Sequence, residues 1–217
     1  AQSTRRPLWW SRPRAGSLTL GGVRVSTEAS DIALARVDGI VSSANWQLLM
    51  RTGVGESLRR AGGAEIEREA MVHGEQPLGA CIATGAGSLG CRRVLHAVSA
   101  WEEASCIGRA MQRALLLAER LGLRSLAVPA LGTGAARVTL EAAAQAQAAA
   151  LHWHLSLGGS RLEEVRFVLY DEDRLRVFRE VLESELTNAD STGPFDRGLP
   201  DERVLSEENA PTELQKP

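Results

Sequence analysis

Short apolar runs alternate along the chain with longer stretches in which apolar residues recur at helical spacing. The short runs predict buried strands at residues 39–43, 80–84, 93–98, 125–129 and 164–170. The helical spacing predicts helices at residues 55–61, 64–73, 106–121, 140–155 and 173–186. Ahead of all of them, residues 17–27 alternate apolar and polar side chains around Gly21-Gly22, which predicts a two-residue β-hairpin.

This order of elements predicts an α/β fold. Strands that alternate with helices are joined by crossovers, so their sheet should be mixed and mainly parallel, with helices on both faces. We therefore expect a three-layer α/β/α sandwich. Thr139 stands where it can cap the helix at residues 140–155, and Gly122 follows the helix at residues 106–121, as glycine often does.

The two ends of the chain lack this periodicity, which predicts a single folded domain over residues 16–187. Residues 1–15 combine arginines, prolines and the pair Trp9-Trp10, which predicts a flexible arginine-rich arm; the tryptophans could instead fold back on the domain or contact a partner. Residues 188–217 are polar and acidic, which predicts a disordered acidic tail or linker. The polar tail and the abrupt start favour a piece of a larger protein.

Composition restricts the function. The 217 residues carry 25 Lys and Arg against 27 Asp and Glu, a formal net charge of -2, so the excess of cations that broad nucleic-acid binding needs is missing. We expect no direct nucleic-acid binding. No apolar run reaches the ~20 residues of a membrane helix and the first residues lack a secretory signal, so we expect no membrane association and a cytoplasmic and/or nuclear location.

The residues that could hold a metal or form disulfides do not form the patterns that this chemistry needs. The three cysteines are odd in number and scattered, so we interpret them as reduced core thiols. His152 and His154 stand two apart on a predicted helix and point to different faces, so they cannot share a metal. We expect no metal site, and we expect His96, which lies in a predicted strand, to be a core histidine.

Two glycine-rich segments have opposite interpretations. Residues 85–90, GAGSLG, match the dinucleotide fingerprint G-x-G-x-x-G, but they precede a predicted strand and not the helix whose N-terminus would face a pyrophosphate, so a hairpin turn explains them better. Gly132-Thr133-Gly134 instead joins a buried strand to a helix, where ligands bind in α/β sheets. A plain strand-to-helix turn explains that loop equally well when it is taken alone.

A second loop strengthens the case for a ligand. Gly53-Val54-Gly55 opens a predicted helix after the strand at residues 39–43. Backbone N–H groups of such loops approach phosphate oxygens without an intervening side chain, and the helix adds its positive pole. Two such loops that flank one crevice predict a site for a diphosphate-containing nucleotide.

A set of motifs in a fixed order resembles a macrodomain over residues 17–186. The segments are SDI at 30–32, VDGIVSSAN at 37–45, GV at 53–54, AGG at 61–63, EA at 69–70, AT at 83–84, VLHAV at 94–98 and PALGTG at 129–134. Any one of them is weak, but their order over this span is specific. The resemblance implies the same three-layer fold, ADP-ribose as the ligand, no cofactor, and ADP-ribose or ADP-ribosylated proteins as partners.

The resemblance also implies roles for individual residues. Asp31 would accept a hydrogen bond from the adenine amino group, the Ile32 backbone would read the ring edge, and Asn45 would face the distal ribose. The two glycine loops would wrap the diphosphate. The full set of ligand-binding residues that it implies is Asp31, Ile32, Asn45, Gly53, Val54, Gly132, Thr133, Gly134, Ala135 and Ala136. The last two replace an aromatic that commonly stacks beside the distal ribose, a loss of ~1–2 kcal/mol of binding.

The chain departs from the hydrolytic members of that family. Mono-ADP-ribosyl hydrolases carry glycines before the Val54 position and an aspartate after it, whereas here residues 50–52 (MRT) replace most of the glycines and Gly55 replaces the aspartate. Glu56 is the candidate that remains, but one residue along a helix turns its side chain about 100° away. A lysine-dependent class is excluded because the only lysine, Lys216, lies in the tail, and the Gln-Glu-Glu signature of glycohydrolases is missing.

Three functions are compatible with these observations. The favoured one is a module that binds ADP-ribose, free or linked to protein. The first alternative is a mono-ADP-ribosyl-protein hydrolase of atypical mechanism, in which Asn45 and Glu56 orient water. The second is a degenerate macrodomain that acts as a protein-interaction surface through its arm or tail.

Overall fold

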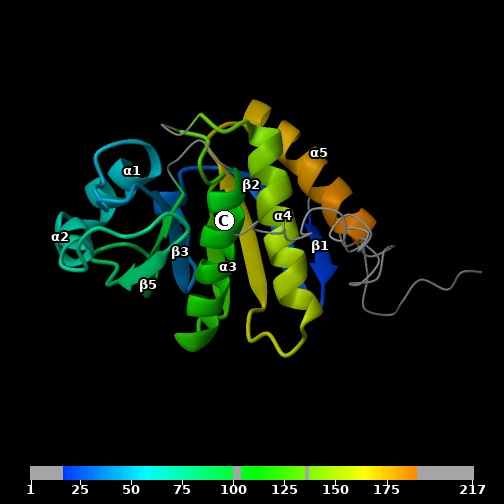
Figure 1. Ribbon diagram of the computed structural model, residues 1–217, viewed down its shortest axis with the longest axis horizontal. Coiled ribbons are helices and arrows are strands. Elements are labelled where there is room, and N and C mark those ends of the chain that lie inside the picture. The colour runs from blue at the N-terminus through cyan, green and yellow to red at the C-terminus, as the bar shows by residue number, and fades with distance from the viewer. Residues whose placement is uncertain (1–16, 100–103, 135–136, 190–217) are drawn as a thin grey trace, which may run out of the picture.

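The computed structural model describes residues 17–99, 104–134 and 137–189 (Figure 1). In chain order the elements are β1 (Ser17–Leu20), β2 (Val23–Ala29), the short 3-10 helix η1 (Ile32–Leu34), β3 (Gly39–Ala44), α1 (Gly53–Gly62), α2 (Glu65–Met71), β4 (Cys81–Thr84), β5 (Arg93–Val98), α3 (Ala104–Arg120), β6 (Ser125–Val128), α4 (Leu140–Ser156), β7 (Glu164–Leu169) and α5 (Glu172–Ala189). The predicted arm at 1–15 lies outside the described residues, as does the predicted tail except for its first two residues, which belong to α5.

The seven strands form one sheet in the order β1-β2-β7-β6-β3-β5-β4. The four inner pairings, from β2–β7 to β3–β5, are parallel, and only the outer pairs β1–β2 and β4–β5 are antiparallel. The prediction of a mixed, mainly parallel sheet is therefore confirmed. The first hairpin is confirmed too: Leu20 pairs with Val23, and the two glycines between them adopt φ of 56° and 83°, the left-handed conformation that a two-residue turn requires.

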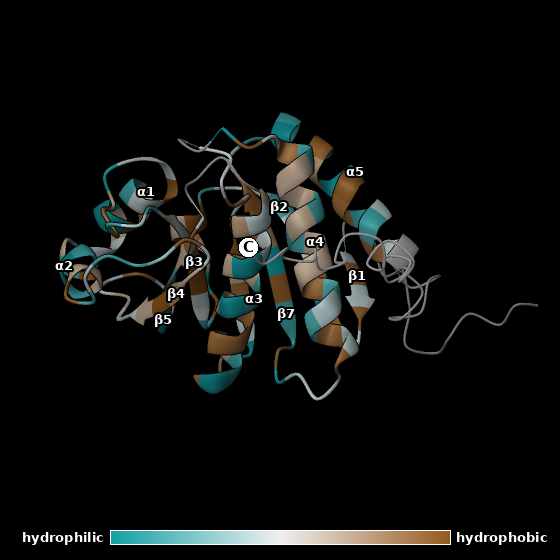
Figure 2. Cartoon of the chain, in the orientation of Figure 1, coloured by the Kyte–Doolittle hydropathy of each residue, from teal (hydrophilic) through white to brown (hydrophobic). Residues whose placement is uncertain are grey.

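Helices cover both faces of this sheet. Successive residues of a strand point to opposite faces, and β3 shows the division clearly: Ile40 packs with Leu58 and Ile66 of α1 and α2, whereas Val41 joins the core that includes Met111 of α3. Helices α4 and α5 pack on the same face as α3 and contact each other. Figure 2 shows apolar residues on the central strands and a mixture of hydrophilic and apolar residues on the helices around them. The three-layer α/β/α sandwich is confirmed.

The GAGSLG segment is a hairpin loop. It connects the antiparallel strands β4 and β5, in which Thr84 pairs with Val94. Gly87 has a φ of 54°, and a Cβ there would collide with the carbonyl oxygen of Gly62. A glycine at this position therefore allows the loop to pack closely against the end of α1. The prediction that this fingerprint does not bind a dinucleotide in the usual way is consistent with that position, because no helix starts after the loop.

The parallel strands bring four loops to one edge of the sheet. β2, β3, β6 and β7 run in the same direction, so the segments that follow them lie together at their carboxyl ends. That edge is where α/β proteins bind ligands. Within the described part of the chain, no helix is both long and apolar enough to cross a bilayer.

Candidate functional site

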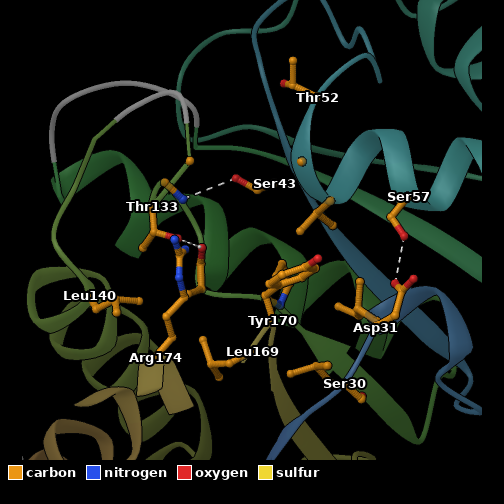
Figure 3. A pocket seen from close by; sticks show the side chains of 18 of the residues that line it. Ser30, Asp31, Ser43, Thr52, Ser57, Thr133, Leu140, Leu169, Tyr170 and Arg174 are labelled. Atoms are coloured by element: carbon orange, nitrogen blue, oxygen red, sulfur yellow. Dashed lines mark hydrogen bonds between the residues drawn. The ribbon is translucent and has the colours of Figure 1, made fainter. Parts of the chain in front are cut away.

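A cavity of about 400 Å³ opens at the carboxyl ends of the parallel strands (Figure 3). Its volume falls within the range of sites for small molecules. Its walls come from the segments that follow β2, β3, β6 and β7, and from the first turns of α1, α4 and α5. Of the ten site residues that the resemblance implies, eight line this cavity: Asp31, Ile32, Asn45, Gly53, Val54, Gly132, Thr133 and Gly134. The other two, Ala135 and Ala136, lie outside the described residues.

Asp31 stands at the N-cap of η1 on one side of the cavity. One carboxylate oxygen, Oδ1, accepts hydrogen bonds from the backbone N of Ala33 at 3.0 Å and from Oγ of Ser57 at 2.8 Å. No described residue donates to the second oxygen, Oδ2, and the side chain is exposed. The carboxylate is thus held in place by one oxygen while the other is available to a ligand. Ile32 is buried behind it and anchors the backbone.

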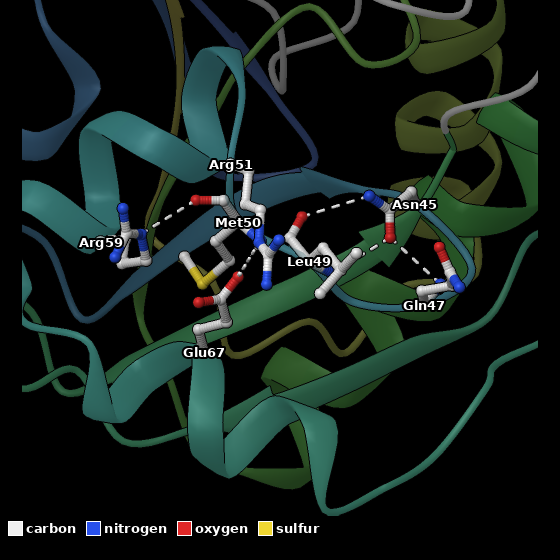
Figure 4. A network of polar contacts seen from close by, with 7 residues as sticks. All are labelled: Asn45, Gln47, Leu49, Met50, Arg51, Arg59 and Glu67. Carbon is white, nitrogen blue, oxygen red and sulfur yellow. Dashed lines mark hydrogen bonds and ion pairs between the residues drawn. The ribbon is translucent and has the colours of Figure 1, made fainter.

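Asn45 follows β3 and shapes the next loop (Figure 4). Its Oδ1 accepts from the backbone N of Gln47 and of Leu49, both at 3.1 Å, and its Nδ2 donates to the Leu49 carbonyl at 3.2 Å. The loop turns tightly through the buried Leu48, which has a φ of 61°. Three bonds of the Asn45 amide are therefore used inside the protein, and one hydrogen of Nδ2 remains for a ligand.

Met50 crowds the position that a side chain at residue 55 would take. Its side chain is buried, its backbone N donates to Oε1 of Glu67 at 2.8 Å, and its carbonyl accepts from Nε of Arg59 at 3.2 Å (Figure 4). A Cβ built on Gly55 would lie 3.2 Å from Cα of Met50. An aspartate at position 55 therefore does not fit without movement of the chain. Glu56 is not among the residues that line the cavity.

Helix α1 points its first turn into the cavity. Its N-cap residue, Thr52, makes no side-chain capping bond, and no described residue accepts from the backbone N of Gly53 or Val54. Gly53 has a φ of 54° and no neighbouring atom within 4 Å of a built Cβ, so the backbone is open to the cavity. These free N–H groups lie at the positive pole of a ten-residue helix, an arrangement that favours an anion.

The second glycine loop is held by side chains of other elements. The N–H of Gly132 donates to Oγ of Ser43 at 3.3 Å, and Ser43 in turn bonds Oγ of Ser99 at 3.0 Å. Gly132 has a φ of 74°, and a Cβ there would lie 2.7 Å from Cδ1 of Ile107, so only glycine fits. No described residue accepts from the backbone N of Thr133. This loop, like α1, thus offers a free N–H group to the cavity.

Among the lining residues that the sequence did not predict, two have side chains suited to a nucleotide. Tyr170, which directly follows β7, is 85% exposed although it is a large aromatic. Arg174 lies in the first turn of α5 and is, among the described lining residues, the only one with a positive charge. The sequence did hint at Tyr170, because it places an aromatic residue at the end of the strand predicted at residues 164–170. Nothing local to the sequence distinguishes Arg174 from the other arginines of α5.

The histidines and cysteines lie away from the cavity. His96 is buried in β5 with Nε2 3.0 Å from Oγ1 of Thr84, which confirms the core histidine, and burial, with a smaller effect of His73, lowers its pKa to about 4. Burial raises the pKa of the Cys81 thiol to about 12. All three cysteines are free; Cys106 is buried, and Cys81 and Cys91 are partly buried and pack against the hydrophobic core. Among the described residues, no three His, Cys, Asp or Glu side chains converge to hold a metal ion.

The sequence is similar to known macro domain proteins. The Macro domain family model matches residues 41–147. An uncharacterized protein of Pyrobaculum aerophilum is 34% identical over 175 residues, which are 77% of this chain and 96% of that protein. A macro domain-containing protein of Caldanaerobacter subterraneus is 33% identical over 157 residues, which are 68% of this chain and 89% of that protein.

The fold is similar to that of solved macrodomains. The Oceanobacillus iheyensis macrodomain with MES bound has 22% identity and a TM-score of 0.73, over 79% of this chain and 97% of that chain. The Trypanosoma brucei macrodomain in complex with ADP-ribose has 25% identity and a TM-score of 0.68, over 72% of this chain and 68% of that chain. The chain belongs to the macro domain family, because it is 33% identical over 157 residues to a macro domain-containing protein, of which it covers 89%, and because it has the macrodomain arrangement of sheet and helices.

Proposed function

We propose that the protein is a module that binds ADP-ribose, either free or attached to a protein. The observation that carries the proposal is the position of two loops with free N–H groups, at the start of α1 and at Thr133, on the wall of one cavity. Such loops suit a diphosphate, which presents oxygens on both sides. The complex of the Trypanosoma brucei macrodomain with ADP-ribose supports the choice of ligand.

The side chains around these loops suit an adenine at one end of the cavity. Oδ2 of Asp31 has no donor among the described residues, so it can accept from the adenine amino group. Tyr170 offers an exposed ring on which a base can stack, and stacking of this kind is worth ~1–3 kcal/mol per base. A base between Asp31 and Tyr170 would be bound by hydrogen bonding and by stacking at once.

The other end of the cavity suits a sugar. Asn45 keeps one amide hydrogen for a hydroxyl, and Thr52 also lines the cavity. The residues described there include no acid that could serve as a general base, because Gly55 carries no side chain and Glu56 does not line the cavity. We therefore favour recognition of ADP-ribose over its cleavage.

A thermal-shift titration with ADP-ribose, ADP and AMP tests the proposal. A ligand that binds the native state must raise the melting temperature. At a ligand concentration a hundred times Kd, the free energy of unfolding increases by about 2.7 kcal/mol. We expect ADP-ribose and ADP to raise it more than AMP, because AMP lacks the diphosphate. No shift with millimolar ADP-ribose would refute binding and would favour a degenerate macrodomain that acts as an interaction surface.

A further inference from the structure

Arg174 lines the cavity, and the two terminal nitrogens of its guanidinium have no partner among the described residues. Its Nε lies 3.3 Å from Oδ2 of Asp171, and its backbone N donates to Oδ1 of the same aspartate at 2.8 Å. Asp171 thus holds Nε of the guanidinium. The two terminal nitrogens remain able to donate two parallel hydrogen bonds to a carboxylate or a phosphate.

The position of Arg174 relates it to one part of the ligand. Figure 3 shows Arg174 and Asp31 on opposite sides of Tyr170, with the arginine extending from α5 toward Thr133. If adenine stacks on Tyr170 with its amino group at Asp31, as in the proposed function on which this inference rests, its ribose is attached at the opposite edge of the ring. The ribose next to the base would then lie on the side of Arg174.

The diphosphate does not need this arginine. The backbone N–H groups at the start of α1 and at Thr133 are already available to it. An unmodified ribose offers Arg174 only neutral hydroxyls, whereas a phosphate monoester on that ribose would offer the anion that a guanidinium fork matches. Arginine serves the same purpose in dinucleotide-binding folds that accept a ribose 2′-phosphate.

We propose that Arg174 recognises a phosphate on the ribose next to the base. The ligand class would be ADP-ribose that carries a phosphate monoester on the 2′ or 3′ oxygen of its adenosine. Among the described residues that line the cavity, Asp31 and Arg174 are the only charged ones, and Figure 3 shows them on opposite sides of Tyr170. Asp31 would select adenine, and Arg174 would select a ribose that carries a phosphate.

Calorimetry on the full chain with ADP-ribose and with ADP-ribose 2′-phosphate tests this assignment. We expect the wild type to bind the 2′-phosphate form about tenfold more tightly, the effect of one additional charge-assisted hydrogen-bonded contact. Arg174→Gln should abolish this preference and change the affinity for ADP-ribose less than about threefold. Arg174→Lys, which keeps the charge but loses the fork, should keep a smaller preference. The matched control is Arg176→Gln, which replaces an exposed arginine two residues further along α5. It should retain the full preference for ADP-ribose 2′-phosphate.

The outcomes separate this proposal from the binding of ADP-ribose itself. Equal affinity of the wild type for both ligands, or weaker binding of the 2′-phosphate form, would overturn the assignment and leave ADP-ribose binding intact. An equal loss for both ligands in Arg174→Gln would also overturn it, because the arginine would then contact the diphosphate. A wild type that binds neither ligand would refute both proposals.

Discussion

Ser57 of α1 donates a 2.8 Å hydrogen bond to Asp31, which joins the start of η1 to the second turn of α1 across the mouth of the cavity. The bond uses the carboxylate oxygen that also caps η1, so the other oxygen has no donor among the described residues. The relationship explains why a carboxylate is suited to this position: it can hold the two elements together and still accept a hydrogen bond from a ligand.

Replacement of Asp31 should weaken the binding of ADP-ribose by roughly tenfold to a hundredfold, the value of a hydrogen bond to a charged group. Asp31→Asn is the sharper variant, because its oxygen can still cap η1 while its NH₂ group faces the adenine amino group and cannot accept from it. Calorimetry measures the loss, and Glu75→Ala, an exposed acid outside the cavity, is the control. Equal binding by wild type and Asp31→Asn would remove the adenine assignment.

Tyr170→Ala should weaken ADP-ribose binding by ~1–3 kcal/mol, because the base loses its stacking partner. Tyr170→Phe should bind like the wild type, since the ring and not the hydroxyl makes the contact. Neither change should alter the free energy of unfolding much, because the side chain is 85% exposed. If the alanine variant binds with unchanged affinity, the base does not stack on this ring.

Gln147 should be important for stability. Its Oε1 accepts from the backbone N of Leu131 and its Nε2 donates to the carbonyl of Pro129, both at 3.0 Å, and its side chain is fully buried. Gln147→Met keeps the volume but leaves two buried backbone groups unpaired, so we expect a loss of at least about 2 kcal/mol in the free energy of unfolding. Urea unfolding measures it. Gln145→Met on the exposed face of the same helix should cost less than about 0.5 kcal/mol.

Gly55→Ala tests the contact with Met50. In an open helical position, alanine would stabilise the protein by roughly 0.5–1 kcal/mol relative to glycine. Because the new Cβ would lie 3.2 Å from Cα of Met50, we expect no gain or a net loss. Ala61→Gly, at an exposed position of the same helix, measures the ordinary difference in helix propensity between alanine and glycine.

Gly55→Asp should destabilise the protein more than Gly55→Ala and should release no ADP-ribose from a modified protein. Release by this variant would show that the cavity can be converted to a hydrolase.

Stability should fall as the pH is lowered from 6.5 toward 4, because of His96. Burial, with a smaller effect of His73, lowers the pKa of His96 in the folded protein to about 4, while the unfolded chain takes up the proton near pH 6.5. The contribution is therefore complete above pH 6.5 and is lost as the pH falls between these values, by up to about 3 kcal/mol. Chemical unfolding at several pH values measures the slope. His96→Gln should flatten the dependence of the free energy of unfolding on pH. His73→Gln, which replaces an exposed histidine, should leave most of that dependence.

The element pattern could be predicted from the sequence because its causes are local. Hydrophobic periodicity, the glycine pair at the first turn and the Thr139 cap act within a few residues, and Oγ1 of Thr139 does accept from the backbone N of Ala142 at 3.2 Å. The bounds of helices shifted by a few residues: α1 starts at Gly53 and not at residue 55. Helix ends depend on contacts with other elements, which the periodicity of a helix does not encode.

The sequence by itself determined the α/β class, the two glycine loops and the exclusion of metal-type and membrane-type patterns, because those depend on residue type and spacing. Only the tertiary structure decided which side chains share the cavity. Tyr170 and Arg174 stand about 140 residues after Asp31 and reach it because β7 inserts between β2 and β6. Likewise, a side chain at Gly55 would press against Met50, which lies there because Asn45 and Glu67 bond the backbone of its loop. Strand order and loop packing are non-local, so no pattern along the chain could reveal them.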